Sequence, residues 1–444
     1  MDASAELRAG APTGRAPGSG NAASLVRSLS IAVLLQWAGA GALLPLLPLY
    51  VKDHGGSDAV VGAVMAAYFA SAFVFQYGAG RLSDRLGRMP VLIGGLVVYA
   101  LGSLLFLVRG PAPLDVVFRA LQGAGAGGAM VAALAMISHA VPLTQRGRAT
   151  GLLYGAELGG LAIGPVVGSL AGVAAMSWLF VAAAVASLVA IGPVLVARAA
   201  ARAAEEPVPG SAETPRRPAS RESGESRELA ASGAARSPAA DGGGGMSRAS
   251  AERAVWGALL AAAMIGVMSG VYESCWTLLM TRHGAAQWEI GVSWTLFALP
   301  FALLSRPAGW LADHFDRRWL AVGSLAWSVA FLATYPFLPG FVPLMVLGIW
   351  ESLGLSITLP ACQSLLGQGT SPERHGHAQG LFAASQTGTT ALAAACAGGL
   401  FGIAPWAPFV GGAVCCALVA TVVVVVWWHV PGRVRESGAA TVCG

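Results

Sequence analysis

The sequence is poor in charge: only 11% of its 444 residues are Asp, Glu, Lys or Arg. A soluble domain usually carries about a quarter. Lysine is almost absent, because Lys52 is its single occurrence. A chain that is 55% hydrophobic cannot cover its own surface with polar groups. We therefore expect lipid rather than water to surround most of the molecule.

The sequence also lacks the residue patterns of metal sites and disulfide frameworks. The chain has six cysteines, and their spacing does not match that of metal ligands. Five of them lie inside apolar runs, where we expect small buried side chains. His375 and His377 have no third ligand nearby. The cysteines are Cys275, Cys362, Cys396, Cys415, Cys416 and Cys443.

Several chemical functions are not expected for similar reasons. We find no phosphate-binding loop, nucleophile elbow or paired cofactor motif, so we expect neither an enzyme nor an ATP-driven pump, and no cofactor. The net charge is +5, but the arginines do not alternate with aromatic residues as a nucleic-acid surface would require. A nucleic-acid partner is therefore not expected.

Long apolar runs make up most of the chain, and a run of roughly 20 apolar residues can cross a bilayer. They predict an all-α membrane protein with twelve transmembrane helices in two six-helix bundles. The domains expected are a disordered tail (1–24), an N-terminal bundle (25–197), a flexible linker (198–253), a C-terminal bundle (254–430) and a second tail (431–444). The runs lie at about 29–51, 59–79, 90–109, 114–138, 149–173, 177–197, 254–280, 288–308, 318–338, 341–366, 377–402 and 407–429.

The arginines give an orientation, because cytoplasmic loops are enriched in positive charge. With the N-terminus inside, the outer loops hold only Lys52, Arg109 and Arg282. We therefore expect a multi-pass protein of the cell membrane, with both termini and the linker in the cytoplasm. The inner loops hold Arg81, Arg85, Arg88, Arg146, Arg148, Arg317, Arg318, Arg374, Arg433 and Arg435.

The two halves repeat at one offset of 229 positions, from the first outer loop to the fifth helix. Parallel repeats related by an axis along the membrane normal are a transporter architecture. The offset therefore predicts two pseudo-symmetric bundles. The pairs include Gly55 with Gly284, Gly62 with Gly291, Asp84 with Asp313, Gln122 with Glu351 and Gly151 with Gly380.

A short charged loop joins the second and third runs. It resembles the signature between helices 2 and 3 of the major facilitator superfamily, which Gly80, Leu82, Asp84, Arg85, Gly87 and Arg88 fit. The resemblance implies a latch that forms in the outward-open state and breaks in the inward-open state. The second copy contains Asp313 and Arg317 but has Asp316 in place of the second glycine. We expect that copy to be the weaker latch.

The fifth run carries glycines four residues apart, which suit close helix packing. The set Gly151, Gly160, Gly164, Pro165 and Gly168 resembles the antiporter pattern of this superfamily, although Ser169 replaces its last glycine. The equivalent of Gly164–Pro165 in the second half is Ala393–Ala394. The pattern therefore favours export. Pro45 and Pro48 are similar to the paired prolines of twelve-helix drug exporters.

The fourth run contains Arg119 and Gln122, which are three residues apart and share one helix face. An arginine inside an apolar helix costs roughly 2.5–3.5 kcal/mol on insertion scales, so it usually faces a cavity. The alternative is that Arg119 extends to the outer headgroups. The two residues resemble an Arg-x-x-Gln-Gly pattern of the superfamily, which implies a role in proton or substrate handling.

Three carboxylates, Glu157, Glu273 and Glu351, lie well inside apolar runs. A buried carboxyl tends to keep its proton, and proton coupling needs a group that is protonated in one state and ionised in another. We therefore interpret these residues as candidates for proton coupling. Structural pairing with a neighbouring helix is the alternative for each of them.

The expected substrate cavity combines aromatic and polar side chains near these acids. Tyr272 and Trp276 flank Glu273, and Trp350 precedes Glu351. An acid beside aromatic rings suits a cationic or amphipathic ligand. Gln36, Gln122 and Gln386 are further candidates for the lining, with hydrogen bonding between helices as the alternative.

Together the motifs resemble the twelve-helix drug:proton antiporter group. They favour a monomeric secondary transporter that exports a small molecule by proton antiport and alternating access. Proton-coupled uptake of a sugar or other metabolite stays open as an alternative, and so does a non-transporting membrane scaffold or receptor. The sequence does not identify the substrate.

Overall fold

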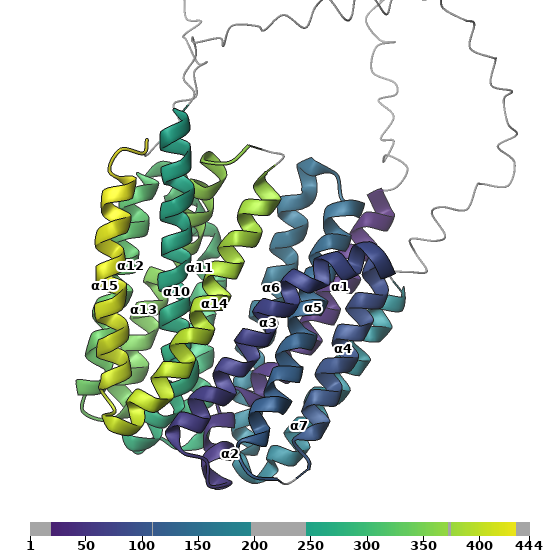
Figure 1. Cartoon of the computed structure of the whole chain (residues 1–444), viewed down its shortest axis with the longest axis vertical. Helices are drawn as coiled ribbons and strands as arrows, with labels where there is room; N and C mark the ends of the chain where they lie inside the picture. Colours follow the sequence, from purple (N-terminus) through teal and green to yellow (C-terminus); the bar gives the residue numbers. More distant parts are fainter. Residues whose placement is uncertain (1–18, 109, 197–245, 372–373, 432–444) are drawn as a thin grey trace, which may run out of the picture.

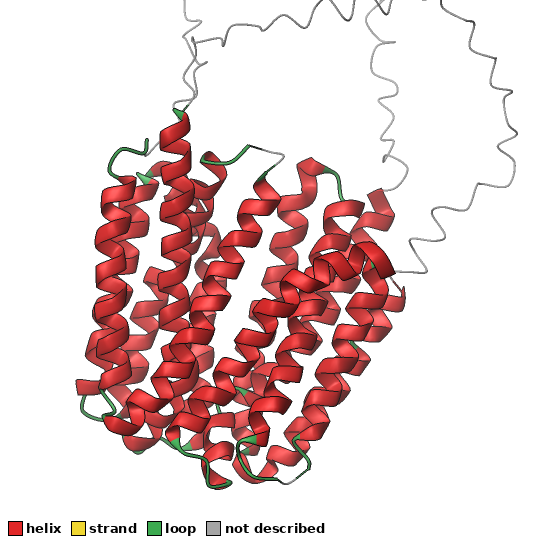
Figure 2. Ribbon diagram, in the orientation of Figure 1, coloured by secondary structure: helices red, strands yellow, loops and turns green. Residues whose placement is uncertain are grey.

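The computed structural model describes residues 19–108, 110–196, 246–371 and 374–431. All regular structure in these residues is helical (Figure 2). The all-α membrane architecture expected from the sequence is therefore confirmed. The C-terminal tail from residue 432, most of the N-terminal tail and most of the linker lie outside the described residues.

The helices form two halves that lie side by side (Figure 1). Ten of the described helical stretches are long and apolar enough to cross a membrane. Helices α11 and α14, with 28 and 29 residues, are also long enough but are not among the ten. The first half comprises α1 (Ser19–Leu43), α2 (Leu47–Asp53), α3 (Asp58–Leu86), α4 (Arg88–Leu105), α5 (Leu114–Ala140), α6 (Leu143–Ala171), η1 (Val173–Ala175) and α7 (Met176–Val189). The second comprises α10 (Arg248–Arg282), α11 (Gln287–His314), α12 (Arg317–Thr334), η2 (Tyr335–Phe337), α13 (Phe341–Gln368), α14 (His375–Ile403) and α15 (Ala407–Trp427).

The first predicted span, 29–51, is divided in the structure. Helix α1 ends at Leu43 and α2 begins at Leu47, because the prolines at 45 and 48 lack the N–H group that a continuous helix needs. The carbonyl oxygen of Pro45 instead accepts a hydrogen bond of 2.9 Å from Thr277 Oγ1 of α10. The break in the first half is therefore stabilised by the second half.

Two predicted boundaries also differ. Helix α1 begins at Ser19, so residues 19–24 are helical and not part of a tail. Helix α10 begins at Arg248, so residues 248–253 do not belong to the linker. The reason is an N-cap, because Ser247 Oγ accepts a hydrogen bond of 3.2 Å from the backbone N–H of Ser250.

The repeat is visible in the backbone. Helices α4 and α12 correspond at both ends when 229 is added to 88 and 105, which gives 317 and 334. Gly55 and Gly284 occupy equivalent turns, and both have φ of +80°. The two halves therefore share one scaffold.

The halves meet at one end of the molecule and separate at the other. We call the end that holds Gly87 and Asp316 the linker end, and the opposite end the far end. At the far end, a Cβ on Gly62 of α3 would lie 2.9 Å from Gly398 Cα of α14, and a Cβ on Gly291 of α11 would overlap α6. Toward the linker end the ribbons of α3 and α14 diverge (Figure 1). There, a Cβ on Gly80, Gly151 or Gly380 would meet no atom within 4 Å.

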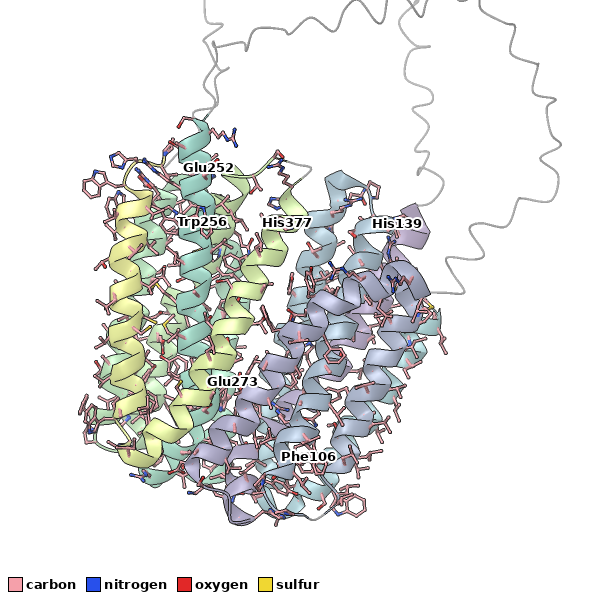
Figure 3. The ribbon with its side chains drawn as sticks, in the orientation of Figure 1. Phe106, His139, Glu252, Trp256, Glu273 and His377 are labelled. Carbon is pink, nitrogen blue, oxygen red and sulfur yellow. The ribbon has the colours of Figure 1, made fainter. Side chains whose placement is uncertain are left out.

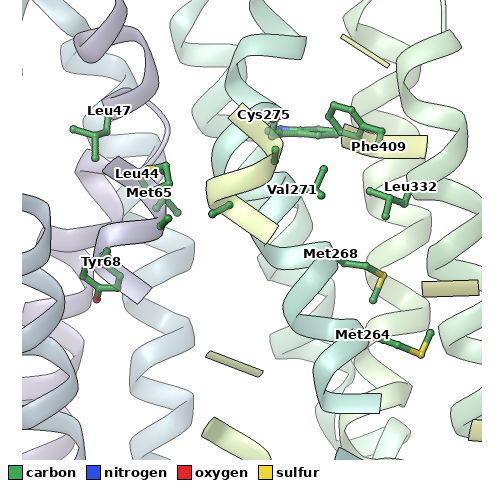
Figure 4. Packing of buried hydrophobic residues seen from close by; sticks show 14 of the residues in the cluster. Leu44, Leu47, Met65, Tyr68, Met264, Met268, Val271, Cys275, Leu332 and Phe409 are labelled. Carbon is green, nitrogen blue, oxygen red and sulfur yellow. The ribbon is translucent and has the colours of Figure 1, made fainter. Parts of the chain in front are cut away.

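A hydrophobic cluster extends through both halves. Figure 4 shows Met264, Met268, Val271 and Cys275 of α10 in this cluster, with Phe409 of α15 beside them. Helix α10 thereby forms the packed centre of the second half, and its other side faces the first half. Residues of α10 therefore contact both halves of the molecule.

The glycine stripe of α6 packs against α1. A Cβ on Gly160 would lie 2.7 Å from Ala38 N, and a Cβ on Gly164 would lie 2.5 Å from Ala38 O. A Cβ on Gly168 would overlap Ala42. Gly151, the first glycine of the same pattern, has no such contact.

We predict that Gly168→Val will destabilise the protein, because the new side chain must force α6 away from α1. The expected loss is about 1–3 kcal/mol, the usual cost of overpacking. Thermal unfolding of the purified protein in detergent measures it. Gly155→Val is the matched control, because a Cβ on Gly155 would meet no atom within 4 Å. Equal midpoints for the two variants would contradict the packing described here.

Candidate functional site

The first charged loop turns at Gly87, which has φ of +88°. Backbone in this region favours glycine, because a Cβ would be strained there. Arg81 lies 4.5 Å above the ring of Tyr77 in its own helix. The side chains of Asp84 and Asp313 are outside the described residues, so the latch stays a prediction.

The second loop is built differently. Asp316 occupies the position of Gly87 with φ of −67° and caps α12. Its Oδ2 lies 2.7 Å from Arg318 Nη2, and these hydrogen bonds from Arg318 hold the pKa of the carboxyl below its usual value. Arg318 Nη1 also donates to the carbonyl oxygen of Trp428 at 3.2 Å. Asp316 therefore ties this loop to the end of α15 within the second half.

Arg119 lies inside the first half. It is 3% exposed, its Nη1 donates to Gln122 Oε1 at 2.8 Å, and its Cζ lies 4.4 Å from the centre of the Tyr68 ring. Gln122 Nε2 in turn donates to Ser103 Oγ at 2.9 Å. These contacts place the guanidinium in a polar network between α3, α4 and α5, away from the position that an extension to the headgroups requires.

Glu273 belongs to the second half but interacts electrostatically with Arg119 of the first. In the described part of the chain, Glu273 Oε2 and Arg119 Nε are both buried without a hydrogen-bond partner. Figure 3 shows Glu273 well inside the bundle, in contrast to Glu252 near the linker end of α10. Each of the two side chains therefore has hydrogen-bonding capacity that the described residues do not use.

Tyr68 connects this pair to Glu157, because its hydroxyl interacts electrostatically with Arg119, Glu157 and Glu273. Glu157 is half-buried on α6, and the described residues provide no hydrogen bond to its carboxyl group. Tyr68 thus lies within electrostatic range of Arg119, Glu157 and Glu273.

A cavity of about 30 Å³ lies within the second half. It contains the predicted residues Tyr272, Trp276 and Glu351. The remaining lining residues are Ser293, Trp294, Phe297, Tyr335, Met345 and Gly348.

Glu351 is held by two tyrosines in this cavity. It is 1% exposed, its Oε1 accepts from Tyr272 at 2.7 Å, and its Oε2 accepts from Tyr335 at 2.6 Å. Trp276 packs edge-on against Tyr335 with ring centres 5.0 Å apart and donates from Nε1 to Ser293 Oγ at 2.9 Å. The carboxyl is therefore fixed at an aromatic wall.

Trp350 does not line this cavity, contrary to the prediction. Its side chain is 53% exposed, whereas Glu351 beside it is buried. Successive residues of a helix point about 100° apart, so neighbours in sequence can face opposite environments. The carbonyl oxygen of Trp350 accepts from Trp327 Nε1 at 3.1 Å.

Two predicted glutamines also lie apart from the cavity. Gln36 is 5% exposed and lines a separate small pocket inside the first half. Gln386 is half-buried on α14, and its backbone oxygen accepts from Thr390 Oγ1 at 2.9 Å. Neither is brought to Glu351.

A family model described as Major Facilitator Superfamily matches residues 29–291 and 258–441, which together cover most of the chain. The chain belongs to this superfamily. This confirms the resemblance inferred from the loop and helix motifs, and it makes the protein a membrane transporter by family.

Curated members of the superfamily show partial similarity. The inner membrane transport protein YajR of Escherichia coli is 32% identical over 33% of this chain and 33% of its own length. Multidrug resistance protein 2 of Bacillus subtilis is 29% identical over 37% of this chain and 41% of its own. The quinolone resistance protein NorA of Staphylococcus aureus is 26% identical over 31% and 35%. The matched stretches thus span well under half of these relatives.

Solved structures of the superfamily cover nearly the whole chain. The nucleoside transporter NupG superimposes with a TM-score of 0.64 at 14% identity, over 91% of this chain and 99% of that one. The human organic anion transporter MFSD10 gives 0.61 at 19% identity, over 90% and 99%. At these identities the likeness shows the major facilitator fold alone.

Sequence reasoning missed Tyr68, Phe297, Tyr335 and Gly348 of this superfamily member. Tyr335 lies near the end of the predicted run 318–338, where the apolar pattern does not indicate a partner for Glu351. The repeat could have indicated Phe297, because adding 229 to 68 gives 297.

We predict that Tyr335→Phe will lower stability by about 1–3 kcal/mol, because it removes a hydrogen bond to a buried carboxyl. The measurement is thermal unfolding in detergent, with Tyr77→Phe as control because Tyr77 is 71% exposed. In the Glu351→Gln background the same change should cost clearly less, which a double-mutant cycle would show as coupling. Additive effects would mean that the two side chains do not interact.

Proposed function

We propose that this protein is a secondary active transporter that exports a small molecule across the cell membrane by proton antiport and alternating access. The observation that carries the proposal is the pair of Arg119 and Glu273, which belong to opposite halves, interact electrostatically and are both buried with an unpaired polar atom among the described residues. The linker end would lie in the cytoplasm, with both termini, and one chain would form the whole transport unit.

The pair supports proton coupling because its energy depends on both protonation and the distance between the halves. An ionised Glu273 attracts Arg119, and this attraction weakens as the distance between the two side chains grows. A protonated Glu273 loses most of this attraction. Binding or release of one proton can therefore shift the balance between two arrangements of the halves.

The packing of the halves supports alternating access. They are in contact at the far end, through α3 with α14 and α6 with α11, and they separate toward the linker end. If the linker end is cytoplasmic, this arrangement admits a molecule from the cytoplasm. The cavity beside Glu351 provides the aromatic and acidic surfaces that would hold it.

The glycine pattern of α6 and two relatives favour export over uptake. Two of the partial matches are named for drug resistance, and the pattern that packs α6 on α1 resembles that of antiporters. Uptake of a metabolite is the alternative. A scaffold or receptor that transports nothing would have to carry three costly internal carboxylates without using them.

We predict that Glu273→Gln will reduce proton-driven transport in proteoliposomes at least tenfold, because the amide cannot exchange a proton. Exchange of labelled for unlabelled substrate without a proton gradient should continue. The control is Glu252→Gln, whose side chain is 62% exposed. A compound panel identifies a substrate, and the direction of pumping in inverted vesicles separates export from uptake. Wild-type rates in Glu273→Gln would contradict its role in proton coupling, and a lack of transport of every compound by the unchanged protein would favour the scaffold or receptor.

We also predict that Asp84→Asn will slow transport more than Asp313→Asn. The first loop has its complete set of signature residues, whereas Asp316 of the second loop is engaged with Arg318 in its own half. Initial transport rates of the two variants, at equal protein levels, test this difference. Equal rates would remove the latch from the mechanism.

A further inference from the structure

The internal repeat places equivalent residues around Arg119 and around the cavity of the second half. Adding 229 relates Arg119 to Gly348, and Tyr68 to Phe297. It also relates Gln122 to Glu351. Helices α3 and α5, which carry the first set, correspond to α11 and α13, which carry the second.

In the first half this arrangement is filled. The Arg119 guanidinium lies over the Tyr68 ring, with 4.4 Å between Cζ and the ring centre. Its Nη1 donates to Gln122 Oε1 at 2.8 Å. An aromatic face and an oxygen acceptor three residues along the helix therefore bind a planar cation.

In the second half, no side chain of the described residues occupies the position of the Arg119 guanidinium. Gly348 provides no side chain, and Phe297, Gly348 and Glu351 all line the cavity of the second half. A Cβ on Gly348 would have its nearest neighbour, Tyr335 Oη, at 3.8 Å, which is an ordinary contact. The cavity therefore occupies the place that the arginine side chain fills in the first half.

At the position where the first half has Gln122, the second half has Glu351. A carboxylate attracts a cation more strongly than an amide does. Each oxygen of Glu351 accepts one tyrosine hydroxyl, and a carboxylate oxygen has a second lone pair available. The residues that line the cavity include neither lysine nor arginine. A carboxylate at an aromatic wall, with no cation from the protein, is suited to a cation from a ligand.

We propose that this cavity binds the guanidinium or amidinium group of an organic cation, in the position that corresponds to Arg119. A planar cation can stack on a ring and donate to a carboxylate at the same time, which a compact ammonium group does less well. The aromatic rings of Trp276 and Trp294 line the cavity and would contact an apolar body attached to this group. That this ligand is the transported substrate rests on the proposed function, whereas its binding does not.

Benzylguanidinium and benzylurea form a matched pair of probes, because they have nearly the same shape and differ in charge. Isothermal titration of the purified full-length protein in detergent, without a proton gradient, should give at least tenfold tighter binding for benzylguanidinium. Equal affinities for the two compounds, or no binding of benzylguanidinium, would overturn the proposal.

Substitutions then locate the site. Gly348→Arg should abolish binding, because the introduced guanidinium occupies the cavity from within, whereas Gly348→Ala should retain it. Glu351→Gln should remove the preference for benzylguanidinium over benzylurea, and this holds even if Gly348→Arg does not fold. Unchanged binding in Gly348→Arg or an unchanged preference in Glu351→Gln would contradict the assignment.

The outcome is separate from that of the transport experiment. Binding of benzylguanidinium without proton-driven transport of any compound would contradict the proposed function alone. Proton-driven transport of another compound, with no binding of benzylguanidinium, would contradict this inference alone.

Discussion

An ionised side chain inside an apolar helix bundle needs a partner, because its transfer from water costs several kcal/mol. Arg119 meets this requirement within the first half, through Gln122 and Tyr68. Glu351 meets it within the second half, through two tyrosine hydroxyls. Glu273 differs from both, because Arg119, with which it interacts electrostatically, belongs to the other half. Interactions within one half move with that half and stay constant, whereas an interaction across the boundary changes when the halves move.

Small residues allow this boundary to be close where the halves meet. Helix α6 uses two faces: Gly160, Gly164 and Gly168 pack against α1, and its next face, with Pro165, meets Gly291 of α11. The first contact lies inside one half and the second lies between halves. A single helix therefore couples the internal packing of the first half to the far-end closure. This gives the glycine–proline pattern a physical role beyond helix packing alone.

Much of this organisation could be predicted from sequence, because hydrophobic run length and a constant repeat offset are local or statistical properties. The offset of 229 anticipated the match of α4 with α12. Contacts between distant segments were not accessible in the same way. Glu351 was identified as buried, but its partner Tyr335 lies in η2 at the end of the preceding predicted run, and the cavity depends on both. Trp350 failed for a related reason, since closeness in sequence does not determine which face of a helix a residue occupies.

The loop at Asp316 shows how one residue can change a prediction. The loss of the second glycine indicated a weaker latch, yet the aspartate builds a new N-cap and an ion pair with Arg318. The position does not lack an interaction; its interaction is directed to α15 of the same half. Loss of a motif residue can therefore mean that a contact has been redirected, and only the geometry distinguishes the two cases.

The differences between the repeats follow from the same electrostatic constraint. A pseudo-twofold axis brings equivalent surfaces of the two halves toward each other. If both halves carried the same ionised residue at the boundary, like charges would face each other in a medium of low dielectric constant. The chain avoids this, because subtracting 229 from 273 gives Leu44, and adding 229 to 119 gives Gly348. Glu273 and Arg119 thus each correspond to an uncharged residue in the other half. The backbones of the two halves are symmetric, but their charges are complementary. A protein with two identical halves could still change between two arrangements of those halves. It would have no attraction across the boundary that depends on whether a carboxyl group is protonated.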